Sequence, residues 1–297
     1  MNLETFIVTV FCMIDDLVQD LAQARRFRQR GPAPRLADSE VLTMELVGEY
    51  LSLDTDQAIF AYFRRAHLAL FPRLGQVHRT TFARQAANLW VVKSLVWERL
   101  VEQLPIDQGL SLIDSVPVPV CRFAHAPACQ AFRGTANFGQ DVSSRMVYYG
   151  LRCHLRVSSE GVVTQLTMAP ASIPDTALVP ELVDGAQGIV LGDRVYWDQP
   201  LRETLLPAGI ILEAPFRKRS SDPTPDRSRL MNRFRRRIET TIGQLVDQYH
   251  LKRVWARDCW HLTSRILRKV LSHTLAVAIN YRIGAEHPLQ IKHLVQP

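Results

Sequence analysis

The first third of the chain has hydrophobic residues at helical spacing. Asp38 or Ser39 is placed to cap the second of these helices. The stretch RRFRQRGPAPR at 25–35 interrupts the pattern with charge, glycine and proline, and is predicted to be a linker. Residues 1–104 are therefore expected to form an all-helical domain, either a DNA-binding domain with a helix-turn-helix or a plain helical cap. The predicted helices share a period of three to four residues and cover 3–24, about 36–50, 55–66 and 78–103.

Beyond Pro105 the pattern changes to that of strands. Residues 147–157 alternate between apolar and polar positions, and the turn SSEG leads into a returning strand at 162–168. The run Leu110–Val116 is followed by prolines, which cannot continue a strand ladder, and is predicted to be a short buried strand. This order predicts an α/β fold with a mixed sheet and helices on its faces. The remaining predicted elements are strands at 188–193 and 210–215 and helices at 175–182, 200–206 and 231–249.

Two of the predicted strands end in an acidic residue. These are Asp114 and Asp193, and a third acid, Glu239, lies beside the apolar stripe of the helix at 231–249. A single strand-end acid can simply cap the following turn. Three carboxylates from two strands and a helix instead supply hard oxygen ligands for a pair of Mg²⁺ or Mn²⁺ ions. Two such ions can hold the attacking and leaving oxygens of a phosphoryl displacement.

The positive charge of the chain is concentrated immediately before Glu239. The 297 residues include 36 Lys and Arg and 29 Asp and Glu, a formal net charge of +7 with a pI near 9.4. Residues 216–237 hold nine basic and two acidic residues, a difference equal to that of the whole chain. This placement favours an approaching phosphate backbone. The alternative is a solvated basic loop in which Arg235 pairs with Glu239 across one helical turn.

Prolines and basic residues share this segment. Pro223 and Pro225 are expected to keep its middle non-helical. The residues expected to contact DNA are basic and flank these prolines: Arg217, Lys218, Arg219, Arg233, Arg235, Arg236 and Arg237.

Cysteine usage and hydropathy narrow the class of protein. Five scattered cysteines are typical of a reduced cytoplasmic protein rather than a disulfide scaffold. The spacing of Cys121, His125 and Cys129 could suggest zinc, but zinc ligands normally pair more closely.

His154 is expected to be packed or to face DNA, and Asp175 to cap a helix. Neither a secretory signal nor a membrane helix is expected, because acidic residues interrupt the apolar stretches.

Several motifs in the chain, taken in order, resemble those of one protein family. Residues 110–250 resemble the DDE transposases of bacterial insertion sequences, and most nearly the insertion-sequence 982 group. Val195 stands where related sequences usually have glycine. The motifs that carry the resemblance are IDSVPVPV, YGLRCHL, APASIPD, VLGDRVYWD and RRRIETTIGQL, preceded by LADSEVLTMEL and FPRLGQVHRTTFAR.

The resemblance implies a domain organisation and a set of catalytic residues. It implies an RNase H-like catalytic domain at 105–250, preceded by the helical domain and followed by C-terminal helices at 251–297 that pack on the catalytic domain. It also implies that Asp114, Asp193 and Glu239 form the catalytic triad and hold two Mg²⁺ or Mn²⁺ ions.

The same resemblance implies a function and partners. The expected enzyme cleaves DNA at the terminal inverted repeats of its element and transfers the 3′ ends to target DNA. It would act as a homo-oligomer on DNA in the bacterial cytoplasm, at the nucleoid, with no small-molecule cofactor and no membrane. Two alternatives stay open: an RNase H-like metal-dependent nuclease without strand transfer, and a catalytically inactive DNA-binding protein derived from a transposase.

Overall fold

The computed structural model describes residues 1–24, 27, 33–141, 145–215 and 225–295, and the expected linker at 25–35 lies mostly outside them. The chain divides into two compact units. A helical unit comprises Met1–Leu104 together with Asp247–Pro297, and a sheet unit comprises Pro105–Val246. No helix among the described residues is long and apolar enough to span a membrane.

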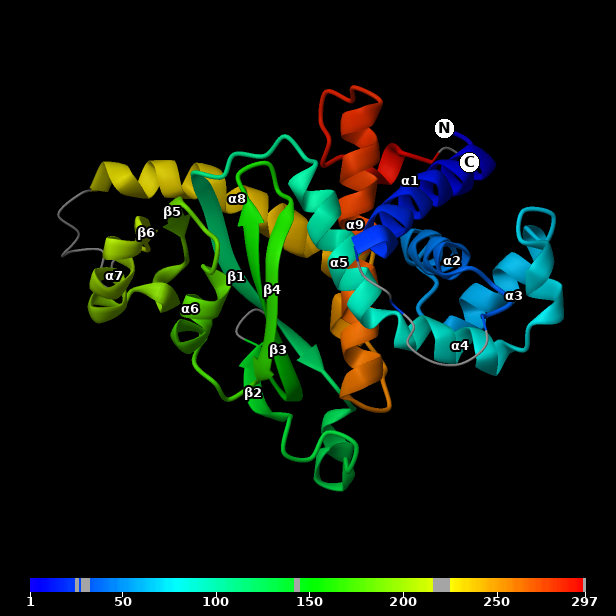
Figure 1. Ribbon diagram of the computed structural model, residues 1–297. Helices are drawn as coiled ribbons and strands as arrows, with labels where there is room; N and C mark the ends of the chain where they lie inside the picture. The colour runs from blue at the N-terminus through cyan, green and yellow to red at the C-terminus, as the bar shows by residue number, and fades with distance from the viewer. Residues whose placement is uncertain (25–26, 28–32, 142–144, 216–224, 296–297) are drawn as a thin grey trace. The chain divides into compact units, whose positions relative to one another are not determined.

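The helical unit contains the predicted N-terminal helices and one more from the C-terminal end of the chain (Figure 1). The helix predicted at 78–103 is divided in two at Leu89. The N-cap of the second helix is Ala37, not Asp38 or Ser39, and the Glu40 carboxylate accepts its backbone N–H at 2.7 Å. The helices of the unit are α1 (Leu3–Ala24), α2 (Asp38–Tyr50), α3 (Asp56–Ala66), α4 (Arg79–Asn88), α5 (Trp90–Glu102) and α9 (Cys259–Arg282).

Helix α9 corrects the expected domain organisation. The sequence analysis expected residues 251–297 to pack on the catalytic domain, whereas α9 belongs to the helical unit and packs on α2, α4 and α5. It is buried along most of its length, from Leu262 to Asn280. A domain limited to residues 1–104 would lack this central helix.

Buried charges explain why α9 packs where it does. On α9, Arg268 and Lys269 both pair with Glu49 of α2, and the Lys269 Nζ to Glu49 Oε2 distance is 2.7 Å. Lys93 of α5 pairs with Glu45 of α2 at 2.8 Å. All five side chains are at most 2% exposed. A buried charge without a partner costs several kcal/mol, roughly 3–5 by mutation, so these pairs hold the helices in one arrangement.

The sheet unit confirms the predicted fold class. Strand order is β2-β3-β1-β5-β6, with β4 also on β3. Strands β1, β3 and β4 pair antiparallel, and β5 and β6 continue the sheet in parallel from β1. This is an RNase H-like mixed sheet with flanking helices. The elements are β1 (Leu110–Pro119), β2 (Asn137–Asp141), β3 (Met146–Ser158), β4 (Val163–Pro170), α6 (Val179–Leu182), β5 (Gly188–Leu191), α7 (Gln199–Leu205), β6 (Ile210–Glu213) and α8 (Pro225–Asp247).

Strand β1 extends through both prolines that were expected to end it. Its pairing with β5 stops at Leu112, so beyond that point only β3 is a partner. The Val120 N–H donates to the Tyr149 carbonyl oxygen on β3. Backbone N–H groups alternate in direction along a strand, so Pro117 and Pro119 would point theirs away from β3. The missing donors therefore remove no ladder hydrogen bond.

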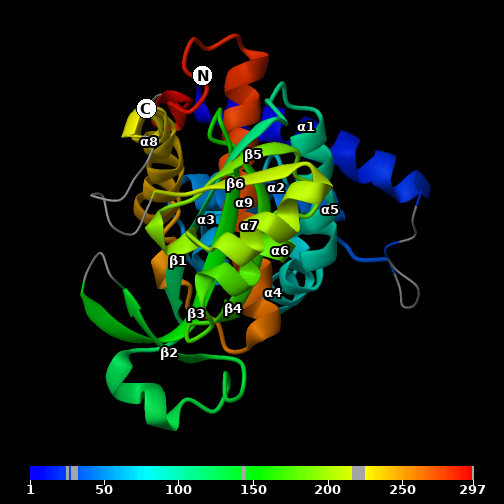
Figure 2. The same ribbon diagram turned by 90° about the vertical axis from the view of Figure 1, so that its left-hand side faces the viewer.

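Strand β3 is buried on both faces over its second half, so of the two alternatives expected for His154, packed or facing DNA, the structure shows the packed one. His154 is fully buried. The Arg156 guanidinium donates to the Asp184 carbonyl oxygen at 3.0 Å and to Thr164 Oγ1 at 3.1 Å. The face carrying these residues is covered by α6 and the segment that follows it (Figure 2). The apolar–polar alternation of β3 predicts one buried face, whereas α6 buries the other face as well.

A hydrophobic core between the sheet, α6 and α7 holds the ends of β1 and β5 together. It includes Ile113 of β1, Val190 of β5, Leu212 of β6 and Leu182 of α6, all at most 2% exposed. Ile113 directly precedes Asp114, and Val190 lies three residues before Asp193. The rigid part of the fold therefore positions the acids.

Candidate active site

The register of β1 and β5 places two acidic residues side by side. Leu112 pairs with Leu191, the last residue of β5. Asp114 lies two residues further along β1, which continues to Pro119, and Asp193 lies two residues beyond the end of β5. Because β1 and β5 run parallel in this register, both residues lie just beyond the last paired position, and both line one small pocket.

Helix α8 closes this pocket, which has a volume of about 30 Å³. That is room for one or two groups the size of water. Among the described residues of its lining, Arg235 is the only cation. The lining residues are Leu112, Ile113, Asp114, Leu191, Gly192, Asp193, Pro215, Met231, Arg235 and Ile238.

The surroundings of Asp114 disfavour its charge. Burial raises the pKa of Asp114 to about 6, and the nearby carboxylates of Asp193 and Asp175 act in the same direction. The Ser115 backbone N–H, which donates to Asp114 Oδ1 at 2.7 Å, and the Arg235 guanidinium lower this pKa. The net result is a pocket that favours an additional cation or a proton.

Asp193 is held by the turn that follows it. Its Oδ1 accepts the Val195 N–H at 2.9 Å and caps a short 3₁₀ turn, Arg194–Tyr196. Val195 is not among the residues with positive φ, so this position does not require glycine. Before it, a Cβ on Gly192 would lie 2.7–2.8 Å from atoms of Tyr196, which is fully buried. The glycine lets the chain pass over the tyrosine ring and turn.

Glu239 lies on α8 outside the lining of the pocket. Its Oε1 accepts from Arg235 Nε at 3.0 Å, and the two side chains are 54% and 51% exposed. The structure thus brings Asp114, Asp193 and Arg235 together and places Glu239 one helical turn further along α8. Within the described ranges, no three His, Cys, Asp or Glu side chains are grouped closely enough to hold an ion. This applies equally to the cysteines and histidine of the 121–129 loop.

The basic segment before Glu239 is described only in part. Arg217, Lys218 and Arg219 lie outside the described residues, whereas Arg235, Arg236 and Arg237 are exposed on α8. The backbone of Arg233 lies in the same helix. The expectation that Pro225 keeps the segment non-helical is wrong, since α8 begins there. Proline suits the first position of a helix, where its missing N–H would have no partner.

The structure adds a polar network beside Asp114 that the sequence analysis did not find. Asp175 is buried and accepts from Arg152 Nη1 at 2.9 and 3.1 Å and from Ser115 Oγ at 3.0 Å. It does not cap the following helix, whose N-cap is Pro174. The only sequence signal, an acid at a helix start, is the same for a cap and for a buried ion pair.

A comparison with protein families identifies the family of the chain. A family model for the transposase DDE domain matches residues 106–258, which is more than half of the chain. The chain belongs to the transposase DDE domain family. No curated protein sequence matches this DDE transposase.

Two solved structures share weaker likenesses with the transposase. The piggyBac transposase synaptic complex with hairpin DNA is 10% identical, covers 96% of this chain and 76% of its own, and has a TM-score of 0.49. The Mos1 mariner paired-end complex with Mn is 11% identical, covers 84% of this chain and 96% of its own, and has a TM-score of 0.20. Both scores lie below 0.5, so the assignment rests on the family model.

Proposed function

We propose that this transposase cleaves DNA at the terminal inverted repeats of its element and joins the freed 3′ ends to target DNA. In this proposal Asp114, Asp193 and Glu239 hold two Mg²⁺ or Mn²⁺ ions. The observation that carries it is the juxtaposition of Asp114 and Asp193 in a pocket closed by the helix of Glu239. We further propose that it acts on DNA as a homo-oligomer in the bacterial cytoplasm, at the nucleoid.

The side chains present suit a divalent cation. Asp114 and Asp193 repel one another across the pocket, and Arg235 is the one cation among the residues described in its lining. Carboxylate oxygens are the ligands that Mg²⁺ and Mn²⁺ prefer. Glu239 completes the set once it separates from Arg235, and that separation costs little because the pair is exposed. The bound ions would supply electrostatic stabilisation of an in-line phosphoryl displacement.

The other residues of the site position these carboxylates and bind DNA. The Ser115 and Val195 N–H groups each fix one carboxylate by a hydrogen bond. Arg235, released from Glu239, is placed to contact a phosphate of the bound strand, and Arg236 and Arg237 lie exposed beside it. Their role in the proposal is orientation of the backbone, and not readout of base sequence.

The proposal is tested with DNA that contains the sequences flanking the reading frame. Asp114→Asn, Asp193→Asn and Glu239→Gln are each expected to abolish Mn²⁺-dependent cleavage and leave DNA binding largely intact. Glu203→Gln is the matched control, an exposed glutamate on α7 outside the pocket. Ca²⁺ should support binding without cleavage, because it accepts looser geometry than Mg²⁺.

The products separate the proposed activity from its alternatives. Joined DNA products support strand transfer, and cleavage without joined products indicates a nuclease. Binding without cleavage by the wild-type protein in Mg²⁺ and Mn²⁺ would indicate an inactive DNA-binding protein. A folded triad variant that cuts at the wild-type rate would remove that residue from the site.

A further inference from the structure

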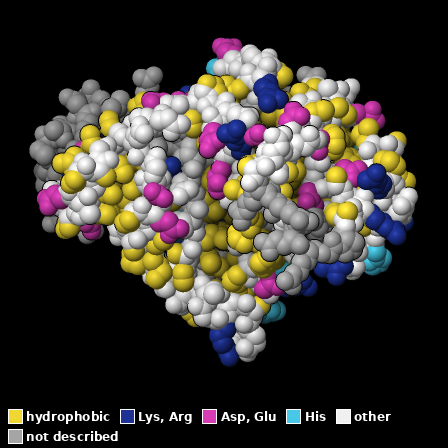
Figure 3. All heavy atoms as spheres, in the orientation of Figure 1, with side chains coloured by type: hydrophobic (Ala, Val, Ile, Leu, Met, Phe, Trp, Pro, Cys, Tyr) yellow, Lys and Arg dark blue, Asp and Glu magenta, His cyan; other side chains and the backbone are white. Residues whose placement is uncertain are grey.

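The helical unit has its own concentration of positive charge. The segment from Thr55 to Asn88, which contains α3 and α4, holds five arginines and a single acidic residue, Asp56. All five arginines are exposed. On the face shown in Figure 3, several Lys and Arg side chains are visible on the right-hand part of the molecule, among hydrophobic and acidic ones. The five arginines of this surface are Arg64, Arg65, Arg73, Arg79 and Arg84.

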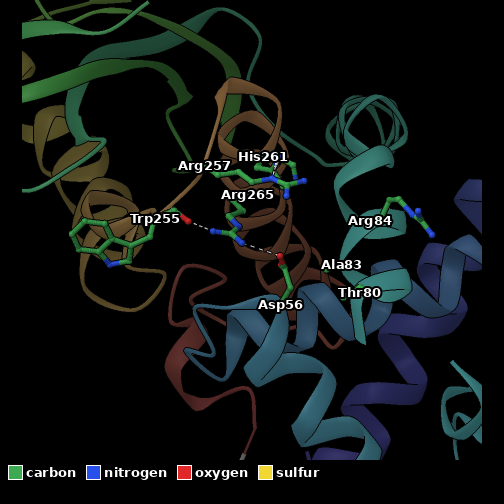
Figure 4. Close-up of a pocket in the computed structure, with 8 residues that line it drawn as sticks. All are labelled: Asp56, Thr80, Ala83, Arg84, Trp255, Arg257, His261 and Arg265. Atoms are coloured by element: carbon green, nitrogen blue, oxygen red, sulfur yellow. Dashed lines mark hydrogen bonds and ion pairs between the residues drawn. The ribbon is translucent and has the colours of Figure 1, made fainter. Parts of the chain in front are cut away.

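A pocket of about 540 Å³ lies between this surface and the start of α9. Residues far apart in sequence meet here, because α4 packs against α9 within the helical unit (Figure 4). The lining comes from α3, from α4, from the segment that leads into α9, and from the first turns of α9. The lining residues are Asp56, Thr80, Ala83, Arg84, Trp255, Arg257, His261 and Arg265.

The single acid of the pocket is already neutralised. Asp56 accepts from Arg265 Nη2 at 2.9 Å and from the buried guanidinium of Arg268. Burial alone would raise the pKa of Asp56, but these two arginines hold it well below its usual range. Arg265 also donates to the Trp255 carbonyl oxygen. The guanidinium groups of Arg265 and Arg268 therefore already have hydrogen-bond partners within the protein.

Two other arginines of the pocket are exposed. Arg257 is 77% exposed and lies 3.5 Å from Asp258 and 2.9 Å from a His261 ring nitrogen. Arg84 is exposed on α4, and no acidic side chain in the described part of the chain pairs with it. Arg84 and Arg257 thus present exposed cations on elements that line one pocket. Asp258 offsets part of the charge of Arg257, and Asp56 is already neutralised. This charge balance favours a phosphate-bearing polymer over a cation.

We propose that this pocket binds the sugar–phosphate backbone of duplex DNA, with Arg84 and Arg257 as its contacting cations. The proposal rests on the function proposed above, which makes DNA the polyanion concerned. Its continuity with the exposed arginines of α3 and α4 favours an extended backbone over a small anion. The C-terminal segment thereby contributes to DNA binding together with the N-terminal helices, so that neither half of the sequence makes this site alone.

The test measures binding of a fluorescein-labelled 40-bp duplex to the full chain by anisotropy, in EDTA and at several salt concentrations. The Asp114→Asn background prevents cleavage. Arg84→Ala combined with Arg257→Ala is expected to weaken binding about tenfold and to reduce the slope of log affinity against log salt by about two. Lysine at both positions should restore most of the slope, since it retains the charge.

Arg282→Ala is the matched control, because Arg282 is an exposed arginine at the opposite end of α9. It should leave the slope unchanged. A slope for the Arg84/Arg257 double variant equal to that of the wild type, or an equal reduction in the Arg282 variant, would overturn the proposal. So would binding of inorganic phosphate that depends on Arg84 and Arg257 while duplex affinity does not. Because no ion or cleavage enters this assay, the proposed activity can fail while this site is upheld, and the reverse.

Discussion

Arg235 Nε lies 3.0 Å from Glu239 Oε1, and the same guanidinium lines the pocket that contains Asp114 and Asp193. One cation thus faces all three carboxylates of the proposed triad. In the absence of ions and DNA, Arg235 offsets part of the negative charge of these carboxylates. In the proposed mechanism divalent cations would take over that role. Its exposure leaves it free to exchange these partners for a DNA phosphate.

We expect Arg235→Ala to lower the cleavage rate more than the DNA affinity. Loss of a group that orients a metal ligand costs about 10–100-fold in activity, whereas one lost phosphate contact weakens binding only modestly. Single-turnover cleavage and binding isotherms measure the two quantities. Arg236→Ala is the control, since Arg236 is exposed on α8 outside the pocket. Equal losses of rate and affinity in the Arg235 variant would assign it a phosphate contact only.

Asp114→Asn is expected to stabilise the ion-free protein. Because the folded-state pKa of Asp114 is raised to about 6, ionising this group on the way to neutral pH destabilises the fold. That destabilisation is complete above pH 6 and disappears below the unfolded-state pKa near 4, and at pH 8 it corresponds to about 1–3 kcal/mol.

Thermal unfolding in EDTA checks this expectation. The midpoint of the Asp114→Asn variant should exceed that of the wild type at pH 8, and the difference should shrink by pH 4.5. Glu203→Gln, at an exposed acid of the same unit, is the control and should leave the unfolding midpoint close to that of the wild type. Saturating Mn²⁺ should reverse the order, because it stabilises only the protein that binds it. A difference independent of pH would show that the carboxylate is not disfavoured by its surroundings.

Gly192→Ala should damage the active site through its backbone. The added Cβ would lie 2.7–2.8 Å from Tyr196, a buried ring that cannot move outward, so Asp193 would be displaced. Overpacking of this kind costs about 1–3 kcal/mol. We expect a lower unfolding midpoint and a reduced cleavage rate.

Gly243→Ala on α8 is the matched substitution. Nothing lies within 4 Å of a Cβ there, and alanine favours a helix by up to about 1 kcal/mol. The Gly243 variant should therefore be as stable as the wild type or more so, and should cut normally. A Gly192 variant with wild-type stability and rate would mean that the Tyr196 ring relocates without moving Asp193.

Arg268→Met should unfold the helical unit at lower temperature. It would leave Glu49 and Asp56 buried or half-buried without their main cation, and breaking such pairs costs roughly 3–5 kcal/mol. Arg99→Ala removes exposed pairs with Asp20 and Glu102 and should change little. Circular dichroism melting of both variants makes the comparison. A small effect at Arg268 would show that the acids can take up protons or reach water.

The sequence by itself determined the secondary structure and the position of two catalytic candidates. Helical and strand periods are local properties, so α1, α3 and the β3–β4 hairpin follow from hydrophobic spacing alone. Asp114 and Asp193 were recognisable because each follows an apolar run that predicts a buried strand. An ionised carboxylate there costs free energy unless it has a cationic partner or a function. The order of the motifs also led to the transposase family that the family model identifies.

Tertiary structure decided what each buried polar side chain pairs with. Asp175 pairs with Arg152 and Ser115, and α9 is held against α2 through Glu49. These partners are 23 to 220 residues apart in the chain, and no local period encodes them. Only the folded chain could also show that Glu239 pairs with Arg235 outside the pocket, because four residues on a helix permit that pair without requiring it. The spacing of hydrophobic residues predicts helices and strands. The partner of a charged side chain depends on which helices and strands the fold brings into contact.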